Sequence, residues 1–157
     1  MLALQGFSIL IIEKEKSFYP LPRAVHFDDE IMRVFQTIGI TDKFLKHTII
    51  NKGTKFVNSK NRVVLDWPRP RSVTENGWYP SYRFHQPDLE RKLRRRLKDF
   101  KKVSIMQNTK VNSLKEEKNS VKICIENINN NKISEITAKY IIGCDGARST
   151  IRKQIKA

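Results

Sequence analysis

The sequence predicts a mixed α/β fold with a short parallel strand, two amphipathic helices and an antiparallel β-meander. Three patterns support this class. Apolar residues fill the segment Ser8–Ile12, as in a buried parallel strand that has helices on both faces. Apolar residues recur at helical spacing within residues 31–38 and again within residues 89–100. From Val103 onward the spacing changes to every second residue, which is typical of strands.

A proline-rich loop, residues 19–23, follows the first strand and precedes a predicted helix. The buried stripe expected for this helix has apolar residues at i, i+3, i+4 and i+7, namely Ile31, Val34, Phe35 and Ile38. Gly39 closes the pattern, and the acidic residues 28–30 precede it, where the helix dipole favours negative charge. We expect Thr41 to cap a second short helix that ends near Lys46.

The middle of the chain predicts a hairpin and then an irregular segment. Residues 55–58 and 62–66 flank Ser59-Lys60-Asn61, a plausible turn between two strands. Residues 67–80 contain three prolines and one glycine, which disfavour regular structure.

Pro87 indicates the first turn of a clear helix, with Gln86 at or near its cap. Its predicted buried stripe consists of Leu89, Leu93, Leu97 and Phe100. The other face is basic and carries Arg91, Lys92, Arg94, Arg95, Arg96 and Lys98. Such a run is more often a solvated face than a binding surface, and we interpret it in that way.

The C-terminal third predicts a meander followed by one more strand. Residues 109–115, 120–126 and 132–138 alternate in polarity, and asparagine-rich turns separate the last two. Tyr140–Cys144 is expected to be a short buried strand that ends at Asp145-Gly146. Ser149 or Thr150 would cap a terminal helix.

The charge of the chain raises nucleic-acid binding as an alternative function. The 157 residues contain 31 Lys+Arg and 16 Asp+Glu, which gives a net charge of +15 and a pI near 10.0. A basic module would bind DNA or RNA with a steep salt dependence. However, the sequence contains no helix-turn-helix signal and no aromatic-rich single-strand motif, and its Lys, Ile and Asn content also fits an AT-rich coding sequence. We therefore interpret the charge as compositional.

Other classes are excluded by simple patterns. No run of 18 apolar residues is present, so the sequence predicts no membrane span. Cys124 and Cys144 stand twenty positions apart without a CxxC motif, which favours a reduced, cytoplasmic protein. No Cys/His cluster indicates a metal site.

Glu13 comes directly after the first predicted strand. In dinucleotide-binding folds, an acidic residue at a strand tip hydrogen-bonds a ribose hydroxyl. A carboxylate in this place projects toward the crevice in which ligands lie. For Glu13 taken alone, a solvated residue at the end of a strand is the simpler interpretation.

Four sequence blocks carry a family resemblance: Phe7–Lys14, Pro20–Glu30, Phe84–Glu90 and Gly143–Arg152. In this order and spacing they resemble the FAD-dependent aromatic hydroxylases, single-component flavoprotein monooxygenases of the type that includes 3-(3-hydroxyphenyl)propionate hydroxylase. The Cys-Asp-Gly-Ala-Arg-Ser block is the most specific. The resemblance implies that residues 1–157 form a partial, truncated Rossmann-like FAD-binding domain. Residues 54–83 would then be a hairpin and loop insertion of the substrate side, and residues 103–138 a β-meander.

The resemblance also implies five cofactor-binding residues. Glu13 would hold the FAD adenosine ribose, and Arg23 would lie near the flavin and pyrophosphate, where a guanidinium supplies charge and donors. Gln86 would reach the cofactor from a helix N-terminus. Asp145 belongs to the Asp-Gly motif that the family uses for FAD and the nicotinamide donor, and Gly146 would permit a tight turn close to the cofactor. The simpler interpretations are a surface arginine, a plain helix cap and an ordinary turn.

The implied reaction is hydroxylation of a phenolic aromatic acid with FAD, NAD(P)H and O2, as in aromatic-compound catabolism in the cytoplasm. The cofactor supplies the oxidative chemistry, while the protein positions rings and excludes water. No metal is implied. We assign no catalytic residue, because no partner at catalytic spacing is evident for the three histidines, His26, His47 and His85.

Two family motifs are not found in the sequence. The G-x-G-x-x-G turn that binds pyrophosphate is absent before Gly6, and so is the later Gly-Asp motif. We therefore expect these residues alone to bind FAD weakly or not at all, and not to hydroxylate. The alternatives are a non-catalytic gene remnant, a misassigned start, or one half of a split protein that needs a complementing fragment.

Overall fold

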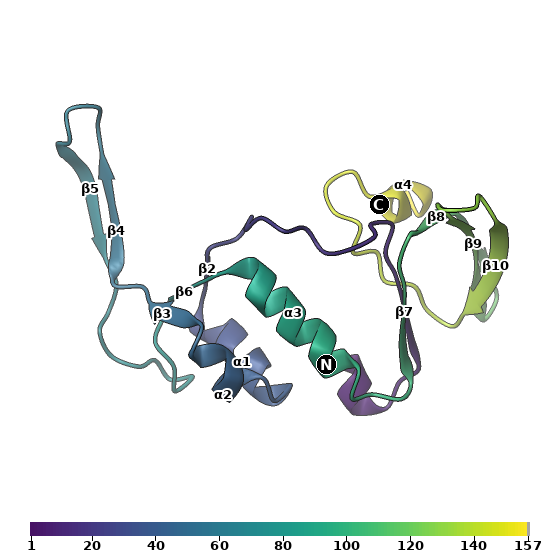
Figure 1. Cartoon of the computed structure of the whole chain (residues 1–157), viewed down its shortest axis with the longest axis horizontal. Coiled ribbons are helices and arrows are strands. Elements are labelled where there is room, and N and C mark those ends of the chain that lie inside the picture. The colour runs from purple at the N-terminus through teal and green to yellow at the C-terminus, as the bar shows by residue number, and fades with distance from the viewer. Residues whose placement is uncertain (157) are drawn as a thin grey trace. The chain divides into compact units, whose positions relative to one another are not determined.

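The computed structural model describes residues 1–156, which fall into two units (Figure 1). The first unit comprises Met1–Ser8 and Phe18–Lys102, and the second comprises Ile9–Ser17 and the chain from Val103 onward. Among the described residues, no helix is long and apolar enough to cross a membrane.

The first unit contains a three-stranded antiparallel sheet, a separate two-stranded hairpin and four helical segments. Its elements are η1 (Leu2–Gln5), β2 (His26–Phe27), α1 (Asp29–Thr37), α2 (Thr41–Leu45), β3 (Thr48–Ile50), β4 (Gly53–Val57), β5 (Val63–Pro68), β6 (Tyr82–Phe84) and α3 (Gln86–Leu97). The sheet order is β2-β6-β3, and β4 pairs only with β5. The predicted hairpin and the irregular segment after it are confirmed.

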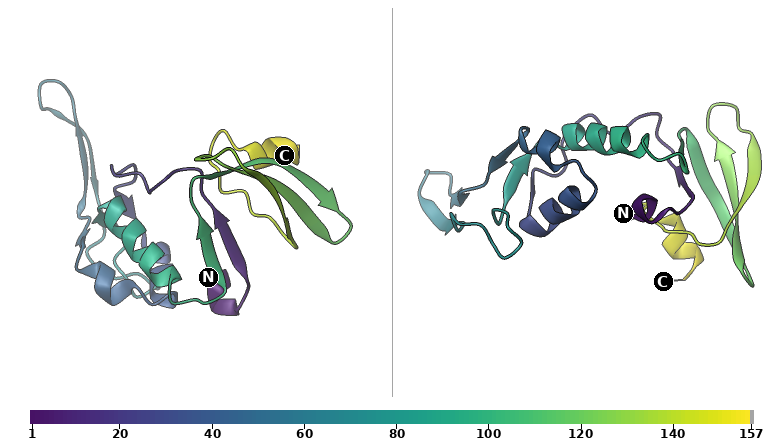
Figure 2. Two further views of the ribbon diagram at one scale, coloured as in Figure 1. Left: turned by 45° about the vertical axis from the view of Figure 1, so that its right-hand side comes forward. Right: turned by 90° about the horizontal axis from the view of Figure 1, so that it is seen from below.

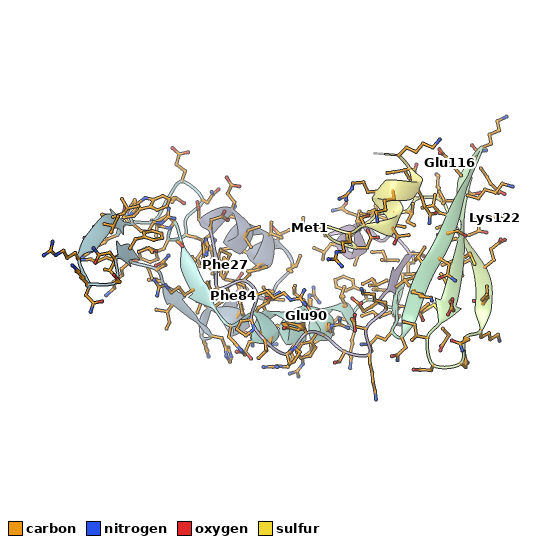
Figure 3. The ribbon with its side chains drawn as sticks, turned by 90° about the horizontal axis from the view of Figure 1, so that it is seen from above. Met1, Phe27, Phe84, Glu90, Glu116 and Lys122 are labelled. Atoms are coloured by element: carbon orange, nitrogen blue, oxygen red, sulfur yellow. The ribbon has the colours of Figure 1, made fainter. Side chains whose placement is uncertain are left out.

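Aromatic rings form the core of this unit. The ring centroid of Phe27 lies 5.2 Å from those of Phe35 and Phe84, 5.4 Å from that of Tyr82 and 5.9 Å from that of Phe44. Figure 3 labels Phe27 and Phe84, which come from neighbouring strands β2 and β6. The contacts with Phe35 and Phe84 are edge-to-face and those with Tyr82 and Phe44 are stacked, and both arrangements add to the stability gained from burial. The core therefore fixes β2, β6 and the two helices α1 and α2 relative to one another.

Helix α1 forms as predicted, and its buried face includes the predicted Phe35 and the partly buried Ile38 but contains Met32 in place of Ile31 and Val34. Asp28 is its N-cap, and its carboxylate accepts a hydrogen bond from the backbone N–H of Ile31. Met32 and Phe35 are buried, whereas Ile31 and Val34 are 41% and 39% exposed. The sequence has two adjacent apolar stripes on this helix, and the aromatic rings of the core select the one that contains Met32.

Helix α2 also forms as predicted, but Thr41 does not cap it. The N-cap is Ile40, which makes no side-chain hydrogen bond, and Thr41 is already the first helical residue. The hydroxyl of Thr41 is buried and has no hydrogen-bond partner among the described residues. An N-cap needs an extended backbone that lets its oxygen reach the next turn, and a residue inside the helix does not have it.

Helix α3 confirms the expected N-terminus. His85 is the N-cap, Gln86 is the first helical residue, and Pro87 is fully buried in the first turn. Leu89 and Leu93 pack against the aromatic core as partly buried residues.

Three of the six basic residues on the basic face of α3 pair with acids on the same helix or just after it. Ion pairs join Arg91 to Asp88, Arg94 to Glu90 and Arg96 to Asp99, and Glu90 is labelled in Figure 3. These pairs support the interpretation of this face as solvated surface.

The second unit consists of a parallel strand pair, a meander and a short helix (Figure 2). Its elements are β1 (Ile9–Ile12), β7 (Val103–Met106), β8 (Thr109–Glu117), β9 (Ser120–Asn127), β10 (Ile133–Ala138) and α4 (Thr150–Gln154). The predicted parallel strand is confirmed, with Ile9 opposite Val103, although β1 is only half buried. Residues 103–106 lie in this pair, so the three-stranded meander itself begins at Thr109.

Helix α4 packs on the meander. Ser149 is its N-cap, as one of the two predicted candidates, and Ile151 is buried. The Gln154 side chain accepts a hydrogen bond from the Leu114 N–H and donates one to the Asn112 carbonyl on β8. On the strands, Lys122, labelled in Figure 3, pairs with Glu117 and Glu135.

The strand expected at Tyr140–Cys144 does not form. The segment has no strand assignment, and Tyr140 and Ile142 are 75% and 68% exposed. An apolar run becomes a strand only if a neighbouring strand pairs with its backbone groups. No strand of the described residues pairs with this segment, so that prediction was wrong for the chain as described.

Candidate cofactor site

Gln86 holds the proline-rich loop of the first unit. Its side-chain oxygen accepts hydrogen bonds from the backbone N–H groups of Arg23 and Ala24, at 2.7 and 2.9 Å. Pro87 helps to fix Gln86, because its restricted backbone suits the first helical turn. Two of the residues implied by the resemblance are therefore in contact, although they stand 63 positions apart.

Two polar side-chain groups at this contact between Gln86 and the loop remain available to a ligand. The Gln86 amide nitrogen has no hydrogen-bond partner among the described residues. The Arg23 side chain is exposed, and its guanidinium lies 4.0 Å from the centroid of the Tyr19 ring. A guanidinium held against a ring keeps its donors and its charge for an anion. The loop thus presents a cation and an amide next to a helix N-terminus.

Glu13 lies directly after β1 in the second unit. Its backbone N–H donates to the Met106 carbonyl at 2.8 Å, and its carbonyl accepts from the Thr109 N–H at 3.0 Å. These bonds fix the residue at the strand end. One carboxylate oxygen accepts a hydrogen bond from the Glu15 N–H at 3.0 Å, and the other has no partner in the described chain. Glu13 is half buried and keeps a free acceptor for a hydroxyl group.

Asp145 makes its contacts to the residues that begin α4. Its two carboxylate oxygens accept hydrogen bonds from the Ser149 hydroxyl and from the backbone N–H groups of Thr150 and Ile151. The Ser149 hydrogen bond is the main reason that the pKa of Asp145 lies below its usual value, and the two N–H donors add to it. Asp145 therefore orders its own loop.

Gly146 follows in a left-handed conformation, with φ of 76°. No atom lies within 4 Å of the position that a Cβ would occupy. The glycine is thus required by the backbone rather than by crowding within the chain, and open space remains beside it. This space would allow close approach of a ligand to the loop.

The sequence did not reveal a partner for His85, but the structure shows one. The Nδ1 atom of His85 lies 3.1 Å from a carboxylate oxygen of Asp88, which also contacts Arg91. Burial raises the pKa of Asp88, but the hydrogen bonds from His85 and Arg91 outweigh it and hold that pKa below its usual value. The i,i+3 spacing in the first helical turn was the signal that could have found this pair.

Comparison with known proteins identifies the family. The family model for the FAD binding domain matches residues 1–157. The chain belongs to this FAD-binding domain family. Its curated relatives include a "Probable NADH-specific resorcinol 4-hydroxylase" of Rhodococcus jostii, which is 31% identical over 155 residues. They also include a 3-(3-hydroxy-phenyl)propionate/3-hydroxycinnamic acid hydroxylase of Mycolicibacterium smegmatis, 31% identical over 148 residues.

The chain spans less than a third of the length of these relatives. The two matches cover 98% and 94% of this FAD-binding chain but only 29% and 26% of the relatives. Among solved structures, a p-nitrophenol 4-monooxygenase from Pseudomonas putida matches 98% of the chain and 38% of its own, with a TM-score of 0.87 and 19% identity. A flavin-dependent monooxygenase in complex with FAD and substrate has the same TM-score at 18% identity, over 99% of this chain and 29% of its own. These structures show the fold.

The available side-chain groups fit FAD. In the first unit, the Arg23 guanidinium and the Gln86 amide are donors of the kind that phosphates and polar ring atoms accept. In the second unit, Glu13 offers a free acceptor suited to a ribose hydroxyl, and Gly146 leaves space for close approach. Asp145 fits less directly, because both of its oxygens already order α4.

Proposed function

We propose that this chain forms the FAD-holding part of a monooxygenase that hydroxylates a phenolic aromatic acid with NAD(P)H and O2. The match of the FAD binding domain to residues 1–157 carries this proposal. The relatives named as hydroxylases of resorcinol and of 3-(3-hydroxy-phenyl)propionate support an aromatic substrate, and the name of the former supports a nicotinamide donor.

Each candidate residue would have a distinct role in FAD binding. Glu13 would accept a hydrogen bond from the ribose, and Arg23 would supply positive charge to the flavin and pyrophosphate region. Gln86 would position Arg23 through its oxygen and would offer its amide N–H groups to the cofactor. Asp145 would act as a positioning residue that shapes the loop of Gly146. When bound, FAD supplies the redox chemistry of the hydroxylation.

Two further parts of the proposal concern the rest of the enzyme. Residues 54–83, which contain the β4–β5 hairpin except its first residue, Gly53, would belong to the substrate side. The 157 residues alone would bind FAD weakly and would not hydroxylate, because they span less than a third of the relatives. Hydroxylation would then require a complementing part of the protein, in the cytoplasm where NAD(P)H is supplied.

The test is a titration of FAD with the purified chain, followed by quenching of flavin fluorescence. We expect weak but saturable quenching, at least tenfold weaker in Asp145→Ala. Ser149→Ala should weaken binding in the same direction, since Ser149 bonds to Asp145 and caps α4. Asp42→Ala removes the same charge from an exposed position in α2 and should leave binding unchanged. A wild-type chain that shows no saturable quenching would contradict the proposal.

A further inference from the structure

A short loop between β5 and β6 is tied to the first turn of helix α1. The side-chain Nδ2 atom of Asn76 donates a hydrogen bond to the Oδ2 atom of Asp29 at 2.7 Å, and the Thr74 hydroxyl donates to the same oxygen at 2.5 Å. We call residues 74–78 the α1-bound loop. Both donors come from this loop, so one carboxylate oxygen fastens it to the helix.

The α1-bound loop leads into aromatic residues that cover part of the core. The Trp78 Nε1 atom donates to the Gln36 side chain at 3.2 Å, and Trp78 and Tyr79 pack against the aromatic core as partly buried residues. The Thr74 N–H donates to the Trp78 carbonyl at 2.8 Å, which closes the loop on itself. Loss of the Asp29 contact would therefore loosen a segment that shields the core.

The loop contains the sequence Asn76-Gly77, which is the only Asn-Gly pair in the chain. In such a pair the glycine nitrogen can attack the side-chain carbonyl carbon of the asparagine, because the glycine has no side chain to restrict the approach. Gly77 has a φ of 76°, and no atom lies within 4 Å of the position that its Cβ would occupy. The pair thus has the residue types and the open surroundings that this reaction needs.

The hydrogen bonds of the bound loop restrain both reacting groups. Asp29 holds the Asn76 amide, and the Gly77 N–H donates to the Thr74 carbonyl at 2.9 Å. The hydrogen bonds from Thr74 and Asn76 also hold the pKa of Asp29 below its usual value, so this carboxylate is ionised at neutral pH. Attack on Asn76 requires that its amide rotates away from Asp29 and that the Gly77 N–H leaves Thr74. The reaction therefore proceeds from the open loop.

We propose that Asn76 is a deamidation site that Asp29 protects, and that deamidation of Asn76 holds the loop open. The Gly77 nitrogen forms a bond to the Asn76 Cγ atom, the Cγ–Nδ2 bond breaks, and ammonia leaves with the proton of the Gly77 N–H. Water then opens the cyclic imide at either of its carbonyls, which gives aspartate or isoaspartate. The sum consumes one water and releases one ammonia, with no oxidation or reduction.

The deamidated side chain cannot restore the contact with α1. A carboxylate at residue 76 has no N–H to donate, and it faces the negative charge of Asp29. Two like charges at hydrogen-bond distance disfavour the closed loop. Deamidation thus releases the loop irreversibly. The reaction needs no flavin, so this inference is independent of the proposed function.

The first test follows deamidation of the purified chain at neutral pH by trypsin digestion and mass spectrometry. The expected peptide, residues 72–83, contains no other asparagine and no glutamine, so its mass gain reports Asn76 alone. Asp29→Ala should deamidate at least tenfold faster than the wild type, because hydrogen bonds to a charged group are lost. Glu30→Ala removes the neighbouring exposed acid from the same helical turn and should change the rate less than threefold.

Asn58 provides an internal reference in the same digest. It lies after β4 in the peptide of residues 56–60 and precedes a serine, and its deamidation rate should be equal in all variants. Circular dichroism checks that each variant is folded. An Asp29→Ala rate at Asn76 equal to that of the wild type overturns the proposal, and so does an equal acceleration at Asn58.

The second test exchanges the two side chains and does not depend on Asp29→Ala. Amide hydrogen exchange over residues 72–83, read by mass spectrometry, measures opening of the loop. Asn76→Asp, which reproduces the aspartate product, should exchange at least tenfold faster than the wild type. Adding Asp29→Asn to Asn76→Asp restores one donor and one acceptor, and exchange should return to within threefold of the wild type. Wild-type exchange in Asn76→Asp, or no recovery in the double variant, overturns the proposal.

Discussion

The contact between Gln86 and the loop at Arg23 gives the sharpest prediction. Gln86→Ala removes an oxygen that accepts two backbone hydrogen bonds, at 2.7 and 2.9 Å. Each such bond contributes a net ~0.5–1.5 kcal/mol, so the pair contributes about 2 kcal/mol to holding the loop closed. At about 1.4 kcal/mol per factor of ten, loss of both raises the open population of the loop roughly 30-fold.

Limited trypsin digestion measures this opening directly, because the Ala24 N–H belongs to the Arg23–Ala24 peptide bond that trypsin cuts and the Arg23 N–H to the peptide bond before it. Mass spectrometry of early time points gives the cleavage rate at that bond, separately from the other basic sites. We expect Gln86→Ala to be cut there roughly 30-fold faster than the wild type. Gln86→Glu is the matched control, since a carboxylate accepts the same two bonds and should keep the rate within about threefold. If Gln86→Ala were cut at this bond at the wild-type rate, the role of Gln86 in holding the loop closed would be refuted.

Three further predictions concern the first unit. Phe44→Ala empties a fully buried position and should lower the free energy of unfolding by about 3–5 kcal/mol, measured from urea melts; a loss below about 1 kcal/mol would contradict the assigned core. Gly53→Ala places a Cβ 2.6 Å from the Trp67 carbonyl oxygen at a φ of 137°, and should lower the urea midpoint, whereas an unchanged midpoint would argue against this hairpin geometry. Hydrogen bonds from Thr74 and Asn76 hold the pKa of Asp29 below 3.8, so their stabilisation is present above about pH 4 and is lost as pH falls through the folded-state pKa. The stability difference between wild type and Asp29→Asn should therefore be constant from pH 5 to 8 and shrink below pH 4, and a constant difference at pH 3 would speak against the contact.

Most helices and strands were predicted correctly because the residues that favour them lie within the segment itself. The apolar run at Ile9–Ile12 gave a parallel strand, and Pro87 marked the start of α3. The segment 140–144 has a similarly apolar pattern but forms no strand, since pairing depends on a neighbour rather than on its own residues. The residue type of Thr41 predicted that it would cap α2. In the structure Ile40 holds the N-cap position, so Thr41 is already inside the helix.

In the candidate site, too, the sequence predicted some features and only the structure shows others. Motif spacing singled out Gln86 and Asp145, but it did not reveal what their oxygens contact. The structure shows that Gln86 fixes a loop 63 positions away and that Asp145 orders the helix after it. The i,i+3 spacing of His85 and Asp88 could have predicted their contact, but the sequence analysis did not predict it.

The sequence by itself predicted the helices α1 to α4 and the strands β1, β4, β5 and β8 to β10, the family, and the residue types available for a flavin. These depend on short patterns that each segment carries in its own side chains. The tertiary structure decided which stripe of α1 is buried, that the side-chain oxygen of Gln86 is engaged by the loop at Arg23, and that residues 140–144 have no partner strand among the described residues. Those outcomes depend on strand register and on contacts between distant residues, and local propensities do not specify either.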